Sequence, residues 1–324
     1  MRMRFWAGGG LRVVVFLALA GALGGAEFED TGKCMMWEAR GANGSAYLLG
    51  SLHACGRDIY PLDKAIQEAY DESDTLVLEM DMSGPNQMKA AQLMAQAGMY
   101  MGNETLSAAL SEEARGKLAE YLKARGMAPA QFDKMKPWFA TMVLAMQEVV
   151  RLGYDPQNGI DLHFFEKAAQ SGKPIEGLET AEEQVAVLSG AMLPIQEKEL
   201  MDFVDEAGEL RGIYEDMAGA WKAGDAAGMK RVVEENLSED PETKDFSVKL
   251  LDERNARMAE RIVKLMDEGK KCFVVVGSAH LVGDKSVVRL LEQKGLTVTQ
   301  VEKAGAEETG VEAEAVQNPA PAGN

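Results

Sequence analysis

The sequence predicts an α/β fold with a mixed or mostly parallel sheet. Two apolar runs with strand character, at 46–49 and 272–276, each lead into a Gly-Ser-x-His tetrapeptide, a helical pattern and a further apolar run. Between these segments, from about 86 to 260, apolar side chains recur mainly at helical spacing. We therefore expect two related strand–loop–helix–strand units with a large helical insertion between them.

In the first unit, a helix is expected over 64–72, because Asp63 is a plausible N-cap and Ile66 lies on an apolar face. The apolar run at 75–78 is typical of a buried strand, and Glu79 follows it directly. Two strands joined by a helical crossover should be parallel. The first unit therefore predicts the parallel part of the sheet.

The insertion contains its clearest helical patterns at 135–152 and 253–267, where apolar side chains share one face. A short strand is expected at 173–179, after a helix that stops at a Ser-Gly pair. In the second unit, the tetrapeptide precedes a helix over about 285–294 and a strand over 296–301. This order repeats that of the first unit.

Both ends of the chain are expected to lie outside the folded domain, which we place at 27–302. Residues 1–26 are typical of a cleaved signal peptide, because arginines precede an apolar and small-residue run that is shorter than the about 20 residues needed to cross a bilayer. We expect export to the periplasm or the extracellular space, with no stable membrane span after cleavage. The tail at 303–324 is rich in Ala, Glu, Gly and Pro, which predicts disorder.

The charge and the cysteines restrict partners and redox state. The formal net charge is −18, and such an acidic surface disfavours nucleic acid and anionic membranes as partners. An oxidising compartment would allow at most one disulfide among Cys34, Cys55 and Cys272. Two alternatives remain open: a Cys34–Cys55 disulfide, or three buried free thiols.

Two of the three histidines, His53 and His280, end the two tetrapeptides. Both follow the carboxyl end of a predicted strand, as do Glu79 and, in the insertion, Glu179, and loops at such ends form the ligand crevice of parallel sheets. Two imidazoles and a carboxylate make the ligand set of a catalytic divalent-metal site with an open position for water. We therefore hypothesise that the two units meet at such a site.

The glycines of the tetrapeptides, Gly50 and Gly277, would let the backbone turn sharply off each strand and let a ligand approach closely. Each of the other candidate site residues also has a purely structural interpretation. Ser51 and Ser278 would cap turns while the histidines satisfy buried polar groups. Glu79 would be a solvated strand end or a helix cap, Glu179 a cap for the helix that begins at 181, and Asp161 an acid favoured at a helix N-terminus.

Other reactive residues have weaker support. The third histidine, His163, lies among apolar residues of a helical pattern and is expected to be a packing or surface residue. Cys55 could act as a thiolate, but no second feature supports this. Neither tetrapeptide matches the Gly-x-Ser-x-Gly elbow of serine hydrolases, and the sequence has no His-Glu-x-x-His motif and no phosphate-binding glycine loop.

Over residues 37 to about 301, the chain resembles the TraB/GumN family, which includes the Tiki proteins. The resemblance rests on these segments in order: YLLGSLH at 47–53, YPL at 60–62, LVLEMD at 76–81, KPW at 136–138, GID at 159–161, GLET at 177–180 with Gln184, ERN at 253–255 and VGSAHLVG at 276–283. Cys55 and Ser278 depart from the usual pattern, because a small or aliphatic residue and an alanine are more common there.

The resemblance implies an α/β fold similar to the ChaN and erythromycin-esterase type, with two related halves. In the Tiki members the paired Gly-x-x-His motifs and the acid are assigned to a metal-dependent protease that prefers manganese or cobalt. Carried over by position, this implies His53, Glu79 and His280 as metal and catalytic residues, with Arg254 as an electrostatic partner. The resemblance transfers a site better than a substrate.

Two functions are therefore considered. The first is an exported hydrolase that depends on a divalent metal (manganese, cobalt or zinc) and acts on a peptide or protein substrate. Glu79 would ligate the metal or accept a proton from its water, and Arg254 would stabilise the oxyanion. The alternative is a non-catalytic binding protein that sequesters a peptide or a haem-like ligand in the same crevice.

Overall fold

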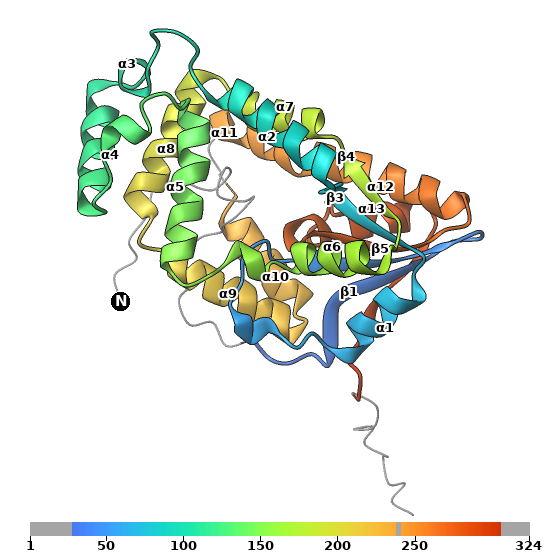
Figure 1. Cartoon of the computed structure of the whole chain (residues 1–324). Coiled ribbons are helices and arrows are strands. Elements are labelled where there is room, and N and C mark those ends of the chain that lie inside the picture. The colour runs from blue at the N-terminus through green and yellow to red at the C-terminus, as the bar shows by residue number, and fades with distance from the viewer. Residues whose placement is uncertain (1–27, 238–240, 306–324) are drawn as a thin grey trace, which may run out of the picture.

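A computed structural model describes residues 28–237 and 241–305 of the chain. The expected signal peptide, 1–26, and all but the first three residues of the expected tail lie outside this range. The described residues form a six-stranded mixed sheet with helices on both faces and a helical region beyond one end (Figure 1). The predicted α/β fold with a mixed sheet is thus confirmed.

The strands lie in the order β4-β3-β5-β2-β1-β6. Neighbours among β2, β5, β3 and β4 are parallel, whereas β1 is antiparallel to both β2 and β6. The strands are β1 (Lys33–Arg40), β2 (Ser45–Ser51), β3 (Thr75–Met80), β4 (Ile175–Glu179), β5 (Lys271–Gly277) and β6 (Thr297–Glu302).

The order of the strands shows that the two predicted units do not form separate halves of the sheet. Strand β5 of the second unit lies between β2 and β3 of the first, so the two units interleave. The last strand, β6, lies at the far edge of the sheet against β1, which the sequence patterns did not predict. Strand β1 has a paired strand on each side. Backbone pairing therefore extends to its polar end residues, Lys33 and Arg40.

Helices cover both faces of the sheet. On one face, Tyr70 of α1 (Lys64–Glu72) and Phe164 of α6 (Ile160–Ser171) pack against Phe273 of β5, with ring centroids 5.4 and 4.7 Å away. Helix α1 begins as predicted, because the Asp63 side chain accepts a hydrogen bond from the Ala65 N–H. Helices α12 (Asp252–Asp267) and α13 (Val287–Gln293) pack against each other and against the sheet.

The insertion forms a second hydrophobic core beyond the carboxyl ends of the central strands (Figure 1). Leu144, Leu200, Phe203 and Ile213 are among its fully buried side chains. The helices of the insertion in this region are α2 (Gly84–Gly98), α3 (Leu106–Ala109), α4 (Glu112–Ala124), α5 (Pro137–Arg151), α7 (Ala181–Ser189), α8 (Leu193–Glu206), α9 (Leu210–Ala223), α10 (Ala226–Glu235) and α11 (Pro241–Leu250). Strand β4 and helix α6 also belong to this segment of the sequence but join the sheet layer.

Among the described residues, no helix has the length and apolar character required to cross a membrane. The helices instead have one buried face, as in α12, where Met258 and Ile262 are fully buried.

Candidate active site

The two tetrapeptides lie next to each other at the carboxyl ends of two neighbouring parallel strands. In the register of β2 and β5, Gly50 pairs with Val276 and Ser51 with Gly277. The Ser278 hydroxyl donates a hydrogen bond to the Ser51 carbonyl (3.0 Å), which joins the two loops directly. The sheet order therefore brings both histidines to one edge.

Gly50 is required by close packing between the loops. A Cβ at this position would lie 2.7 Å from Ser278 Oγ and 3.0 Å from Met35 Cγ, closer than side-chain carbons approach other atoms. The Gly50 carbonyl accepts a hydrogen bond from the indole N–H of Trp221 on α9, at 2.6 Å. This buried contact attaches the helical insertion to the base of the site.

Three side chains converge above this junction. Nε2 of His53 and Nε2 of His280 each lie 3.8 Å from Oε1 of Glu79 at the end of β3. A Cβ at Gly277 would lie 3.3 Å from both Glu79 Oε1 and His53 Nε2, and 3.7 Å from Cδ2 of His280. Glycine at this position therefore leaves open the space that these three residues face.

His280 is held in one orientation by Asn255 of α12. Its Nδ1 lies 2.6 Å from Asn255 Oδ1, while the Asn255 amide Nδ2 donates to the Lys285 carbonyl (2.9 Å). Because that amide nitrogen is already a donor, Oδ1 accepts, and this network assigns the proton to Nδ1 of His280. Burial, reinforced by the Arg254 charge, lowers the pKa of His280 to about 3. The ring is thus neutral and presents its Nε2 lone pair to Glu79.

His53 has a different partner. Its Nδ1 lies 3.3 Å from Oδ2 of Asp161 in the first turn of α6, and Oδ1 of Asp161 accepts a hydrogen bond from the Ser51 hydroxyl (2.9 Å). Burial alone would lower the pKa of His53, but the neighbouring Asp161 and Glu79 carboxylates outweigh burial and raise it to about 9. About a third of the His53 side chain is exposed, against 4% for His280.

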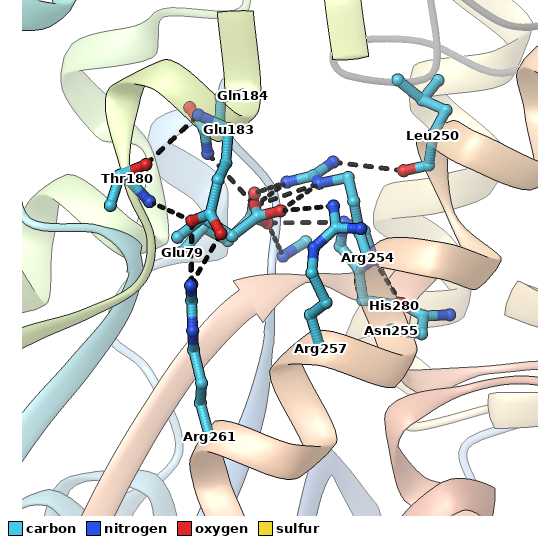
Figure 2. A network of polar contacts seen from close by, with 12 residues as sticks. Glu79, Thr180, Glu183, Gln184, Leu250, Arg254, Asn255, Arg257, Arg261 and His280 are labelled. Atoms are coloured by element: carbon cyan, nitrogen blue, oxygen red, sulfur yellow. Dashed lines mark hydrogen bonds and ion pairs between the residues drawn. The ribbon is translucent and has the colours of Figure 1, made fainter. Parts of the chain in front are cut away.

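Arg254 of α12 joins the partly buried carboxylate of Glu79 to the fully buried carboxylate of Glu179 (Figure 2). Its Nη2 lies 2.8 Å from Glu79 Oε2 and 2.6 Å from Glu179 Oε2, and Nε also donates to Glu179, while Nη1 donates to the Leu250 carbonyl. Glu179 is fully buried. All three nitrogens of Arg254 are therefore engaged, and the guanidinium fixes the Glu79 carboxylate from the side opposite the histidines.

The charge environment keeps Glu79 ionised. Burial by itself would raise the pKa of Glu79. The charges of Arg254 and His53, together with the Gly277 N–H that donates to Oε1 at 2.7 Å, outweigh burial and hold this pKa well below its ordinary range.

The network continues away from the site along α12 (Figure 2). Arg261 donates three hydrogen bonds to Glu183, whose carboxylate also accepts from the Thr180 N–H at the start of α7. Gln184 donates to Glu179 at 3.5 Å. Helix α12 thus carries the arginines that connect the site to the N-terminus of α7.

A cavity of about 40 Å³ opens beside the histidines. Its polar part consists of the tetrapeptide residues and Arg254. Its opposite wall is apolar and comes from α9 and from the junction of α11 and α12: it is formed by Tyr214, Met217, Leu250 and Leu251. The insertion therefore shapes the space in front of the site.

The donor atoms fit a divalent cation in kind, since imidazole and carboxylate suit manganese, cobalt and zinc. Bonds of about 2.0–2.2 Å would place tetrahedral ligand atoms about 3.4 Å apart, and the separations of 3.8 Å are a few tenths of an ångström wider. Accordingly, within residues 28–237 and 241–305, no group of three His, Cys, Asp or Glu side chains is arranged to hold a metal ion as it stands. The open space at Gly277 would allow the side chains to close by that amount.

The remaining sequence candidates lie elsewhere. His163 packs against Tyr60, with ring centroids 5.1 Å apart. The Cys55 thiol donates to the Asn158 carbonyl, and all three cysteines are buried and unpaired. Asn255 was named only within the family segment ERN at 253–255 and without a role, because it lies within a helix and no local pattern marks it as a partner of His280.

Residues 35–300 match the family model described as the TraB/PrgY/gumN family. The chain belongs to this family. Similar proteins include "Uncharacterized protein YbaP" from Escherichia coli (strain K12), which is 27% identical over 255 residues, covering 76% of this chain and 87% of that protein. "Metalloprotease TIKI2" from Xenopus tropicalis is 23% identical over 351 residues, covering 90% of this chain and 65% of that protein. An uncharacterised protein from Treponema pallidum (strain Nichols) is 21% identical, with 81% of each chain covered. No solved structure matches the chain significantly.

Proposed function

We propose that this protein is an exported hydrolase that uses a divalent metal ion, held by His53, His280 and Glu79, to cleave peptide bonds. The proposal depends mainly on one observation: both histidines direct Nε2 to the same carboxylate oxygen, while each Nδ1 faces an oxygen acceptor. Histidines that bind metals typically have this second contact, which fixes the ring and its tautomer. The family relative named as a metalloprotease supports the same chemistry.

The bound cation would supply an activated water, whose pKa falls from about 15.7 to near 7 on a zinc-type ion. We assign Glu79 to the ligand set rather than to proton transfer, because its low pKa makes it a weak proton acceptor. Most of the N–H groups of Arg254 already donate to Glu79, Glu179 and the Leu250 carbonyl, so we assign it to holding Glu79 in place rather than to stabilising an oxyanion. His280 and Glu79 are rigidly held, and His53 is the most exposed of the three.

The alternative function, a binding protein for a peptide or haem-like ligand, has less support. The cavity at the histidines is about 40 Å³, whereas pockets that enclose drug-sized ligands are about 300–1,000 Å³. Export is part of the proposal on the strength of residues 1–26 alone.

Metal content tests the site. The full-length protein and three variants would be incubated with manganese, freed of unbound ion and analysed by mass spectrometry of the metal. We expect His53→Ala and His280→Ala to lose most of the bound metal. Gly277→Ala keeps every ligand but fills the space between them, so it should lose metal too while the protein remains folded.

His163→Ala is the matched control, because it removes the third histidine, whose ring packs against Tyr60 and Phe164. It should retain wild-type metal content. If both His53→Ala and His280→Ala also retain it, the proposed site is wrong. Peptide cleavage that is lost with EDTA and restored by manganese would then distinguish a hydrolase from a binding protein.

A further inference from the structure

Resting on the proposed hydrolase function, we propose that the cavity beside the histidines is a subsite for a small, uncharged side chain of the substrate residue next to the cleaved bond. The site thereby selects peptides with residues of about alanine size at that position.

The geometry places the cavity where such a side chain would lie. The tetrapeptide residues form its floor, including Gly277, whose missing side chain leaves the space between His53 and Glu79 open. A peptide bond held at that floor directs a neighbouring side chain toward the opposite wall. Met217 and Tyr214 of α9 and Leu250 of α11 belong to that wall.

The wall offers no charge to a substrate side chain. Its four members are apolar or aromatic, and Leu250 and Leu251 are 1% and 7% exposed. Two cationic side chains are among the lining residues, and both already have acidic partners: Arg254 contacts Glu79 and Glu179, and His53 contacts Asp161. A charged substrate side chain would lose its water here without gaining a partner, and such burial is strongly unfavourable.

The volume sets the size limit. The cavity measures about 40 Å³, whereas a protein cavity that admits benzene is about 150 Å³. An aromatic or long aliphatic side chain would have to displace the wall. Met217 is the wall residue best suited to test this limit, because it is only partly buried and its removal shortens the wall.

The experiment maps cleavage sites. The metal-loaded full-length protein would digest an equimolar peptide library, and mass spectrometry would identify the residues on both sides of every cleaved bond. We expect alanine, glycine or serine to exceed lysine, glutamate and phenylalanine at least about tenfold at one of the two positions. Met217→Ala should admit leucine and phenylalanine there and reduce this ratio several-fold.

Met201→Ala is the control, because Met201 is also a partly buried methionine of the insertion but does not line the cavity. It should leave the cleavage profile unchanged, and thermal unfolding would verify that both variants fold. Cleavage with no preference between alanine and lysine or phenylalanine would overturn the subsite while leaving the hydrolase intact. The subsite would also be overturned, with the hydrolase intact, if Met217→Ala and Met201→Ala gave the same cleavage profile. Absence of any cleavage by the metal-loaded protein would overturn the proposed function and the subsite with it.

Discussion

Asn255 has the most specific single-residue role in the site, because it determines which nitrogen of His280 carries the proton. Both residues are almost completely buried, at 3% exposure each. The amide cannot rotate without losing its bond to the Lys285 carbonyl. Its effect on a bound ion would therefore act through the orientation of the His280 ring.

We expect Asn255→Ala to weaken metal binding by about 10–100-fold, the usual cost of removing a partner of a metal-binding histidine. Calorimetric titration with manganese would measure the change. Asn86→Ala, which removes an exposed asparagine bonded to Asp81, is the control and should not alter affinity. Equal affinities for the wild type and Asn255→Ala would show that His280 is oriented without this contact.

At the level of single residues, the sequence predicted that the histidines and Glu79 would lie together, because all three follow apolar strands and strand ends of a parallel sheet meet. Their role as metal ligands stays a prediction. Asp161 was predicted as an acid at a helix N-terminus, and the structure adds its contact with His53. Asn255 could not be found in this way, since 25 residues separate it from His280 and only the packing of α12 brings the pair together.

Among the elements, α12 and α7 are connected by the Arg261–Glu183 pair. The hydrogen bonds from Arg261 lower the pKa of Glu183 to about 2, below its ordinary value of 4.5. A carboxyl whose pKa is depressed in the folded state stabilises that state above its unfolded pKa, and the contribution is lost as pH falls toward the folded pKa.

We therefore expect the stability difference between the wild type and Glu183→Gln to be largest above about pH 4.5 and to shrink as the pH falls toward 2. Urea unfolding at several pH values would measure it. In a protein that already carries Arg261→Gln, the substitution Glu183→Gln should change the pH dependence of the stability much less. A difference that stays constant across this range would mean that the ion pair does not form in solution.

The elements themselves were predicted unequally. Helix α1, which has a clear cap and an apolar face, begins where the sequence indicates, because Asp63 accepts from a backbone N–H group. Strand β1 was missed, and the position of β6 at the far edge was not foreseen. Both depend on pairing between the two ends of the described chain, which no local pattern contains.

For the whole molecule, the thiols report on global unfolding. Burial is the main cause that raises the pKa of Cys34, Cys55 and Cys272 to about 12 in each case. A buried thiol with such a pKa contains almost no reactive thiolate at neutral pH. The three cysteines belong to the sheet layer, which must open before any of them reacts.

We expect the native protein to react negligibly with Ellman's reagent at pH 8, and the protein in guanidinium to release three equivalents, matching the three cysteines of the chain. A protein purified without reductant should give the same count. Release of one equivalent after unfolding would reveal a disulfide and contradict the arrangement of buried free thiols.

The position of β5 between β2 and β3 also has a consequence for the order of synthesis. Ser51 and Ser278 are 227 residues apart in the chain, so β2 and β3 emerge from the ribosome long before the strand that belongs between them. Until β5 has been made, neither the second histidine nor the backbone N–H that holds Glu79 exists. A nascent chain therefore carries no complete site, and under the proposed function hydrolysis would begin only after almost the whole chain has been made.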